Sequence, residues 1–199
     1  MKPAIKVLGV PDDINSSFMR GSSAAPPLIR EALYSASSNL FSESGLNLDQ
    51  KGIWEDLGDI EFAGQVAVEN FKKIKTFVKD VLVSDQKLVS LGGDHSVSWP
   101  ILDAHLDIWG TLDILHIDAH PDLYDSLLGN KLSHASPFAR IMEAGRASRL
   151  VQVGIRTLNK HQREQAEKFG VEIYQMKDLT KLSSLSFSRP VCCSIDIAA

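Results

Sequence analysis

The sequence predicts an α/β fold with a mostly parallel sheet that helices cover on both faces. Short, nearly continuous apolar segments recur along the chain, helical segments alternate with them, and no repeat or linker divides the 199 residues. Strands buried on both faces are apolar throughout, as these segments are. A chain of this length can bury the core of one domain, so we expect a single domain over residues 1–199.

Seven segments are expected to form strands because they are apolar or rich in β-branched residues. They are 5–10, a short stretch near 53–57, and parts of 87–94, 111–120, 149–156, 171–176 and 189–196. The last of them indicates a buried strand, Val191 to Ile195, that ends at Asp196. Its neighbours Cys192 and Cys193 are expected to be buried and unpaired, since adjacent strand residues point to opposite faces.

Helices are expected between these strands. Pro26 and Pro27 suit the first turn of a helix over 25–36. Apolar residues three and four apart predict the longest helix over 62–83. A polar helix over 159–170 is expected to end at Gly170, and another to begin at Pro137 with Ser136 as its N-cap.

Charge and composition exclude several classes of partner. The formal net charge is −4 and no Lys/Arg-rich run occurs, which argues against nucleic acid and anionic membranes. No apolar stretch is long enough for a transmembrane helix, and the chain begins directly with a strand instead of a signal peptide. With only two cysteines, a reducing compartment and a cytoplasmic location are expected.

Three predicted strands end in polar clusters, at the edge where open parallel sheets bind ligands. The clusters are Gly92-Gly93-Asp94-His95-Ser96, Asp118-Ala119-His120-Pro121-Asp122 and Ser194-Ile195-Asp196. In the second, alternation on an extended chain would place two carboxylates and an imidazole on one side. Such a set without thiolates suits Mn²⁺, Fe²⁺ or Zn²⁺, and its oxygen content favours manganese. The alternative is a solvated acidic loop.

Histidines outside this cluster have two interpretations. His95 follows a glycine pair that permits close backbone approach, so it is either a metal ligand at the sheet edge or a structural hydrogen-bonding residue. The neighbouring cluster favours the ligand, with Asp94 orienting one of the ligands. His116 lies deeper on its strand, so we expect it to make a hydrogen bond in the core.

The motifs LGGDHS, DAHPD and SHASPFARIME, in this order, resemble the ureohydrolase family of arginase, agmatinase and formiminoglutamase. GVPDDINSSFMRGSSAAPPLIREAL is similar to the family's first strand, loop and helix, and RLVQVGIR to a later strand. GNKLSHASPFARIME is most similar to the plant-type arginase/agmatinase branch. The resemblance extends from about residue 5 to residue 197.

This resemblance implies a three-layer α/β/α fold and two Mn²⁺ ions whose shared hydroxide attacks a guanidinium carbon, releasing urea and an amine. It implies that His95, Asp118, Asp122 and Asp196 bind one ion. His120 and Asp118 would bind the other, with Asp118 and Asp196 bridging both. The implied substrate is a small guanidino compound, either arginine or agmatine, and a homo-oligomer is expected.

The resemblance also implies that His134 moves protons or assists the leaving amine, a role suited to its near-neutral pKa. The same stretch is typical of a helix start. Asn130 and Ser133 match a substrate-facing loop, and turn formation in LGNKLS explains them equally well.

The chain departs from the family at its end. Where the family has Ser-x-Asp-x-Asp, this chain has Ala198 in place of the second aspartate. We therefore expect a C-terminally incomplete domain that lacks later strands and helices and has weak or no activity. One alternative is a non-catalytic remnant that binds a metal or a partner subunit. Another is a zinc deacetylase, against which the GGDHS and DAHPD pair argues.

Overall fold

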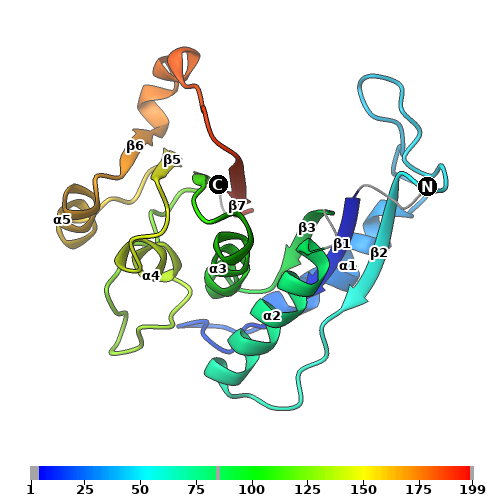
Figure 1. Cartoon of the computed structure of the whole chain (residues 1–199), viewed down its shortest axis with the longest axis horizontal. Coiled ribbons are helices and arrows are strands. Elements are labelled where there is room, and N and C mark those ends of the chain that lie inside the picture. The colour runs from blue at the N-terminus through cyan, green and yellow to red at the C-terminus, as the bar shows by residue number, and fades with distance from the viewer. Residues whose placement is uncertain (1–4, 84–85, 198–199) are drawn as a thin grey trace. The chain divides into compact units, whose positions relative to one another are not determined.

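The computed structural model describes residues 5–83 and 86–197, which form two compact units, Met1–Val97 and Ser98–Ala199 (Figure 1). The expectation of a single domain stays a prediction. None of the helices within these described ranges is long and apolar enough to cross a membrane.

The N-terminal unit contains a three-stranded parallel sheet in the order β2-β1-β3. In Figure 1, α2 lies in front of this sheet and α1 behind it, which gives three layers. A Cβ added at Gly9 of β1 would meet Pro26 of α1 at 3.0 Å, so this helix packs closely on the strand. The elements are β1 (Ile5–Val10), η1 (Ser22–Ala24), α1 (Ala25–Leu33), β2 (Trp54–Asp59), α2 (Ala67–Leu82), β3 (Lys87–Gly92) and η2 (His95–Val97).

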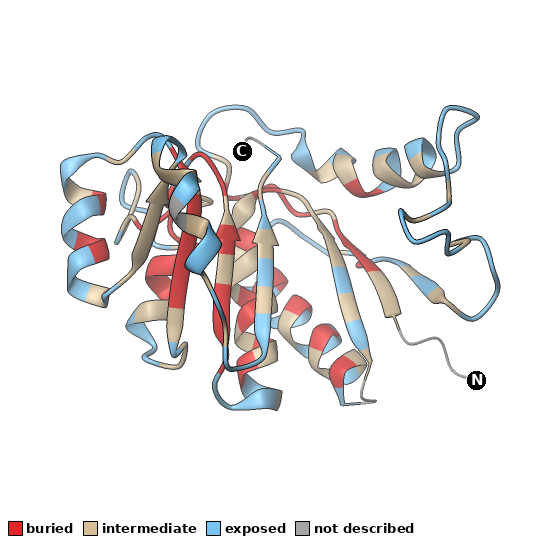
Figure 2. Cartoon of the chain, turned by 90° about the horizontal axis from the view of Figure 1, so that it is seen from above, coloured by how far each residue is buried: buried red, intermediate tan, exposed pale blue. Residues whose placement is uncertain are grey.

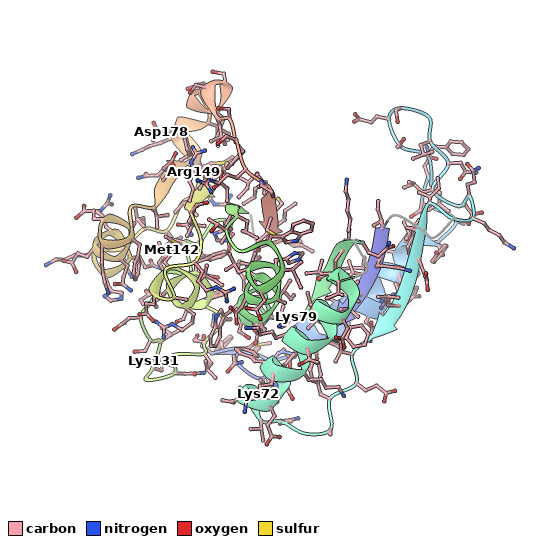
Figure 3. All side chains as sticks on the ribbon, viewed as in Figure 1. Lys72, Lys79, Lys131, Met142, Arg149 and Asp178 are labelled. Atoms are coloured by element: carbon pink, nitrogen blue, oxygen red, sulfur yellow. The ribbon has the colours of Figure 1, made fainter. Side chains whose placement is uncertain are left out.

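Helix α2 is shorter than the predicted helix over 62–83. Its N-cap, Val66, has an extended backbone, so the preceding residues lie outside the helix. The apolar spacing is confirmed within it: one side is buried, while Lys72 on the other faces solvent (Figure 3). The buried side consists of Asn70, Phe71, Ile74, Val78 and Leu82.

The C-terminal unit contains a four-stranded parallel sheet in the order β6-β5-β4-β7. One face of this sheet packs against side chains from α3, α4 and α5 in a single apolar cluster that includes Ile114, Phe138 and Leu150. The elements are α3 (Ser98–Trp109), β4 (Asp113–Ile117), α4 (Pro137–Glu143), β5 (Arg149–Ile155), α5 (Lys160–Phe169), β6 (Glu172–Gln175), η3 (Met176–Ser184) and β7 (Val191–Ile195).

The parallel α/β prediction is confirmed in both units, and all seven predicted strands are present. The reading of β7 as a buried strand is wrong. Val191 and Ile195 are 39% and 66% exposed, and Cys193 is exposed too, because these three side chains share the face of β7 opposite the apolar cluster. In Figure 2, the strand that leads to the C-terminus accordingly has exposed, pale blue bands. Cys192, on the cluster side, packs against it. Both cysteines are unpaired, as predicted.

The starts of α1 and α4 and both ends of α5 follow the predicted local signals, whereas α1 ends at Leu33, before the predicted residue 36. Pro26 and Pro137 occupy first-turn positions of α1 and α4, and Ser136 is the N-cap residue of α4. Helix α5 begins with a capping box between Asn159 and Gln162 and ends at Gly170, which has a φ of 65°. Helix α3 was not predicted. Its buried residues are Pro100, Leu102, Ala104 and Leu106.

Candidate functional site

The register of the C-terminal sheet places two predicted ligands at one edge. In the parallel pair of β4 and β7, His116 is opposite Ser194 and Ile117 is opposite Ile195. The next backbone hydrogen bond runs from Asp196 N to Ile117 O at 3.0 Å, so Asp118 and Asp196 follow the ends of adjoining strands. This is the carboxyl edge, where ligands bind in open parallel sheets.

Asp118 is the most enclosed acidic group at this edge, with 1% of its surface exposed. Its Oδ2 lies 3.0 Å from His116 Nε2, and its Oδ1 accepts a hydrogen bond of 2.8 Å from the backbone N–H of His120. The His120 ring nitrogen Nδ1 is 3.5 Å from the same Oδ1. The contacts with His116 and with the His120 backbone thus fix the plane of the Asp118 carboxylate. The imidazole of His120, a second predicted ligand, lies beside this carboxylate.

His116 makes the core hydrogen bond that its position on the strand predicts. It is fully buried, its ring centroid lies 4.0 Å from that of Phe138, and its Nδ1 is 3.0 Å from Gln152 Nε2 on β5. Gln152 also donates to Pro121 O at 2.6 Å, which ties the DAHPD segment to β5. Gln152 was not identified from the sequence, where its only signal was a polar residue inside the apolar segment RLVQVGIR.

The remaining DAHPD residues do not continue the strand, which corrects the prediction of one extended segment. Strand β4 ends at Ile117, and Asp122 has a left-handed φ of 45°. Asp122 is buried at 6% exposure, whereas the His120 side chain is 51% exposed. The turn brings His120 next to Asp118 through local contacts, in place of the alternation expected on an extended chain.

In the N-terminal unit, Asp94 holds together the loops that follow β1 and β3. Its carboxylate accepts hydrogen bonds from Ser96 N (2.9 Å), Asn15 N (3.1 Å) and the Ser16 hydroxyl (3.2 Å). Burial raises the pKa of Asp94, and the hydrogen bonds from Ser96 and Ser16 oppose this rise. His95 is the first residue of η2, directly after this aspartate, and it stays a predicted ligand.

The glycine pair before His95 has the role that the sequence suggests. A Cβ at Gly93 would lie 2.1 Å from Asp12 O, and the next residue, Asp94, donates its backbone N–H to that carbonyl at 2.9 Å. Only glycine permits this approach between the two loops. The motif GGDHS therefore depends on the loop that follows β1.

That loop is organised by Asp13, which was not selected from the sequence. Burial opposes ionisation of its carboxyl. Hydrogen bonds from Gly21 N (2.6 Å), Arg20, and the N–H and hydroxyl of Ser23 outweigh this and lower its pKa to about 2. A carboxylate that accepts several donors is stabilised in its charged form. Asp13 therefore fixes the path of the chain into α1.

Residues 124–135 form a loop whose ends are joined by a hydrogen bond from Tyr124 N to Ala135 O. Its tip is a turn in which Leu127 and Asn130 exchange two backbone hydrogen bonds, and Leu128 has an unusual φ of 54°. The Asn130 side chain accepts from Leu132 N at 2.8 Å. The turn-forming role of Asn130 is therefore confirmed, while its contact with substrate stays a prediction. Lys131, labelled in Figure 3, lies on this loop.

Ser133 and His134 lie at the end of the loop, just before α4. Ser133 is buried, its hydroxyl accepts from Ala135 N at 3.3 Å, and it lies 3.4 Å from His134 Nδ1. The tight turn before Ser136 and Pro137 thus holds the His134 ring. Both interpretations of this stretch, helix start and proton-transfer residue, are compatible with that geometry.

The donor set at the carboxyl edge of β4 fits a divalent cation such as Mn²⁺. Two buried carboxylates, Asp118 and Asp122, are costly to hold in a protein interior unless they are paired or bind a cation. Oxygen and imidazole donors suit Mn²⁺. The Cys192 thiol is not part of this donor set, because Cys192 is opposite Ile114 near the start of β4 and packs against the apolar cluster.

Comparison with known proteins identifies the family. Residues 3–197 match the model of the Arginase family. The chain is 45% identical to arginase 1, mitochondrial, of Oryza sativa subsp. indica, over 96% of this chain and 59% of that protein. It is 36% identical to an N(1)-aminopropylagmatine ureohydrolase of Thermus thermophilus, over 85% of this chain and 57% of that protein.

The solved structure of arginase from Medicago truncatula superposes with a TM-score of 0.82 at 44% identity, covering 90% of this chain and 59% of that one. This chain therefore spans somewhat over half the length of these relatives. The predicted likeness to plant-type members is confirmed, and the match sets the deacetylase alternative aside. By sequence over nearly its whole length and by fold, the chain belongs to the arginase family.

Proposed function

We propose that the chain forms the metal-binding part of a Mn²⁺-dependent hydrolase that releases urea from a guanidino compound. The observation that carries this proposal is the Asp118 carboxylate, which is buried at the carboxyl end of β4, held by His116 and the His120 backbone, and adjoined by Asp196 on the next strand. Family membership supports the same reaction class.

Each predicted ligand has a proposed role. His95, Asp118, Asp122 and Asp196 would hold one ion, and His120 would hold the other together with Asp118 and Asp196, which both ions would share. A metal held by these residues would lower the pKa of a bound water, so that hydroxide would be available at neutral pH. The chain's own contribution is to orient the carboxylates, which the contacts of Asp118 with His116 and the His120 backbone support.

The loop before α4 is proposed to face the substrate. His134 would transfer a proton to the departing amine, with its ring held by the Ser133 turn, and Asn130 and Ser133 would contact the guanidino compound. The relatives' names include arginases and an aminopropylagmatine ureohydrolase, so arginine and agmatine are both candidate substrates.

The residue at position 198 bears on the proposed rate. Ala198, which lies outside the described residues, takes the place of an aspartate in the family motif. Counted against the family motif, this chain has all the protein ligands of one ion and three of the four ligands of the other. We therefore propose weak or absent activity for this polypeptide. The second candidate function, a non-catalytic remnant that binds one metal or a partner subunit, rests on the same substitution.

Two measurements on the purified chain test the proposal. Metal analysis after Mn²⁺ loading should give two ions per chain for the hydrolase, and one or none for the remnant. Urea release should be assayed with arginine, agmatine and other guanidino compounds, for this chain and for an A198D variant. Any urea formed should increase in A198D. A chain that binds no Mn²⁺ would contradict the proposed function, and a rate typical of full-length relatives would contradict the proposed impairment.

A cytoplasmic location and a homo-oligomeric state complete the proposal, and both rest on the sequence reading alone. The names of the plant relatives place those proteins in mitochondria or chloroplasts. Fractionation of cells that express the tagged native gene, together with light scattering of the purified chain, tests the two statements separately.

A further inference from the structure

The core of the C-terminal unit contains a chain of polar side chains that crosses two strands. His116 on β4 and Gln152 on β5 are paired in register, and both are fully buried. Around them the same face of the sheet is apolar and packs against Phe138 and Leu123. Buried polar groups of this kind are costly unless they form hydrogen bonds. The direction of each hydrogen bond follows from which atoms can donate and which can only accept.

The direction of these hydrogen bonds is determined at Gln152. Its Nε2 lies 2.6 Å from Pro121 O, which can only accept, so the amide must place its NH₂ group there. The second N–H of that group points to His116 Nδ1 at 3.0 Å, and Nδ1 must therefore be the unprotonated, accepting nitrogen. The proton of the neutral ring is then on Nε2, which donates to Asp118 Oδ2 at 3.0 Å.

One feature of Gln152 opposes this orientation, and the two N–H contacts outweigh it. Its Oε1 is buried and has no hydrogen-bond partner among the described residues. Leaving an amide oxygen unsatisfied costs roughly 1–3 kcal/mol, so the orientation is retained because both N–H donors are used. The reversed amide would place its oxygen against Pro121 O and remove the donor to His116.

We propose that Gln152 and His116 are positioning residues for the Asp118 carboxylate: Gln152 fixes the Nε2–H tautomer of His116, whose proton holds Asp118 in the orientation that binds a divalent cation. This inference rests on the proposed function, because it assigns Asp118 to the metal. Partners that orient a ligand in this way commonly change metal affinity roughly 10- to 100-fold when they are removed.

The first test reads the tautomer directly, without metal or activity. Two-dimensional ¹⁵N NMR of the full chain labelled with ¹⁵N-histidine identifies His116 as the signal lost in H116Q. We expect a protonated Nε2 and an unprotonated Nδ1. A proton on Nδ1 would overturn the proposal.

The second test measures Mn²⁺ affinity by titration calorimetry on wild type, H116L, H116Q and Q152M, after circular dichroism has shown that each is folded. H116L lacks the donor and should bind roughly 10- to 100-fold more weakly. H116Q places its amide nitrogen at the same number of bonds from the backbone as Nε2, so its affinity should be close to that of wild type. Q152M should fall between H116L and wild type.

The outcomes separate this inference from the proposed function. Equal weakening in H116L and H116Q, or unchanged affinity in both H116L and Q152M, would overturn the positioning role alone. A wild-type chain without Mn²⁺ binding would overturn the proposed function as well. If H116L is unfolded, the positioning role is tested by the Mn²⁺ affinities of H116Q and Q152M relative to wild type, together with the His116 tautomer from NMR.

Discussion

Two buried aspartates lie at opposite ends of β4 and differ in what surrounds them. Asp113, the first residue of the strand, is 4% exposed and accepts a hydrogen bond of 2.6 Å from the Ser148 hydroxyl. Asp118, directly after the last residue of the strand, is 1% exposed and is contacted by His116 and His120. Both aspartates are almost completely buried, so burial alone does not identify a metal site.

The two aspartates differ in the groups that contact them. At the amino end, a serine hydroxyl and the backbone hydrogen bond from Asp113 N to Pro190 O join neighbouring segments, which is a structural role. At the carboxyl end, the neighbours are imidazoles and a second carboxylate that follows β7, groups that bind cations. Substitutions at both ends of β4, and at an aspartate and a loop elsewhere in the chain, test this contrast.

The largest effect should come from D118N, with D113N as the matched control on the same strand. Mn²⁺ at about 1,000 times its Kd should stabilise wild type by roughly 4 kcal/mol, because it binds only the folded chain. D118N should lose most of this gain and D113N should keep it. Thermal unfolding with and without Mn²⁺ gives the values, and equal responses from the two variants would remove the distinction between the ends.

A third buried carboxylate, Asp13, shows what a structural aspartate does with pH. Its pKa is lowered from 3.8 to about 2, so it contributes about 2 kcal/mol of stability above pH 4. This contribution is lost as the pH falls to about 2. The difference in unfolding free energy between wild type and D13N should shrink over that window and be independent of Mn²⁺. A difference that stays constant from about pH 6 to about pH 2 would contradict the assignment.

The amino end of β4 can be tested through Ser148. S148A removes the hydroxyl that lies near Asp113 Oδ1 and Leu112 O. Loss of a hydrogen bond to a buried carboxylate should cost about 1–2 kcal/mol of unfolding free energy in urea. The Mn²⁺-dependent gain in stability should be unchanged, and a reduced gain would show that the two ends are coupled.

The smallest effect is expected at the tip of the loop 124–135. Leu128 is 88% exposed and has a φ of 54°, a conformation that costs a leucine roughly 1 kcal/mol. L128G should therefore raise the unfolding free energy slightly, offset by the greater freedom of glycine in the unfolded chain. L46G, at an exposed leucine without a positive φ, serves as the control and should give no gain.

The strands could be predicted well because they are short apolar segments bounded by polar clusters. The start of α2 was misplaced, since the apolar spacing continues past the point where Val66 becomes extended. Strand β7 was read as buried, because apolar composition does not show which face of a sheet another element covers. The second error concerns the surroundings of the strand in the folded chain, which its apolar composition does not reveal.

The candidate site was predictable only in part. Asp118 and Asp196 could be paired because parallel strands share an edge, and the register confirms this. Gln152 could not be linked to His116 from the sequence, because their contact depends on the register of β4 against β5. The left-handed turn at Asp122 likewise replaces the alternation that the sequence suggested.

Paramagnetic broadening by Mn²⁺ would locate the metal relative to the two ends of β4. Backbone amide NMR signals of the ¹⁵N-labelled chain are recorded while Mn²⁺ is added below one equivalent. Binding at the carboxyl end of β4 should broaden the amide signals of Asp118, Ala119, His120 and Asp122 before those of Asp113 and Ser148 at the other end. Uniform broadening, or broadening that begins near Asp113, would contradict a metal site at Asp118.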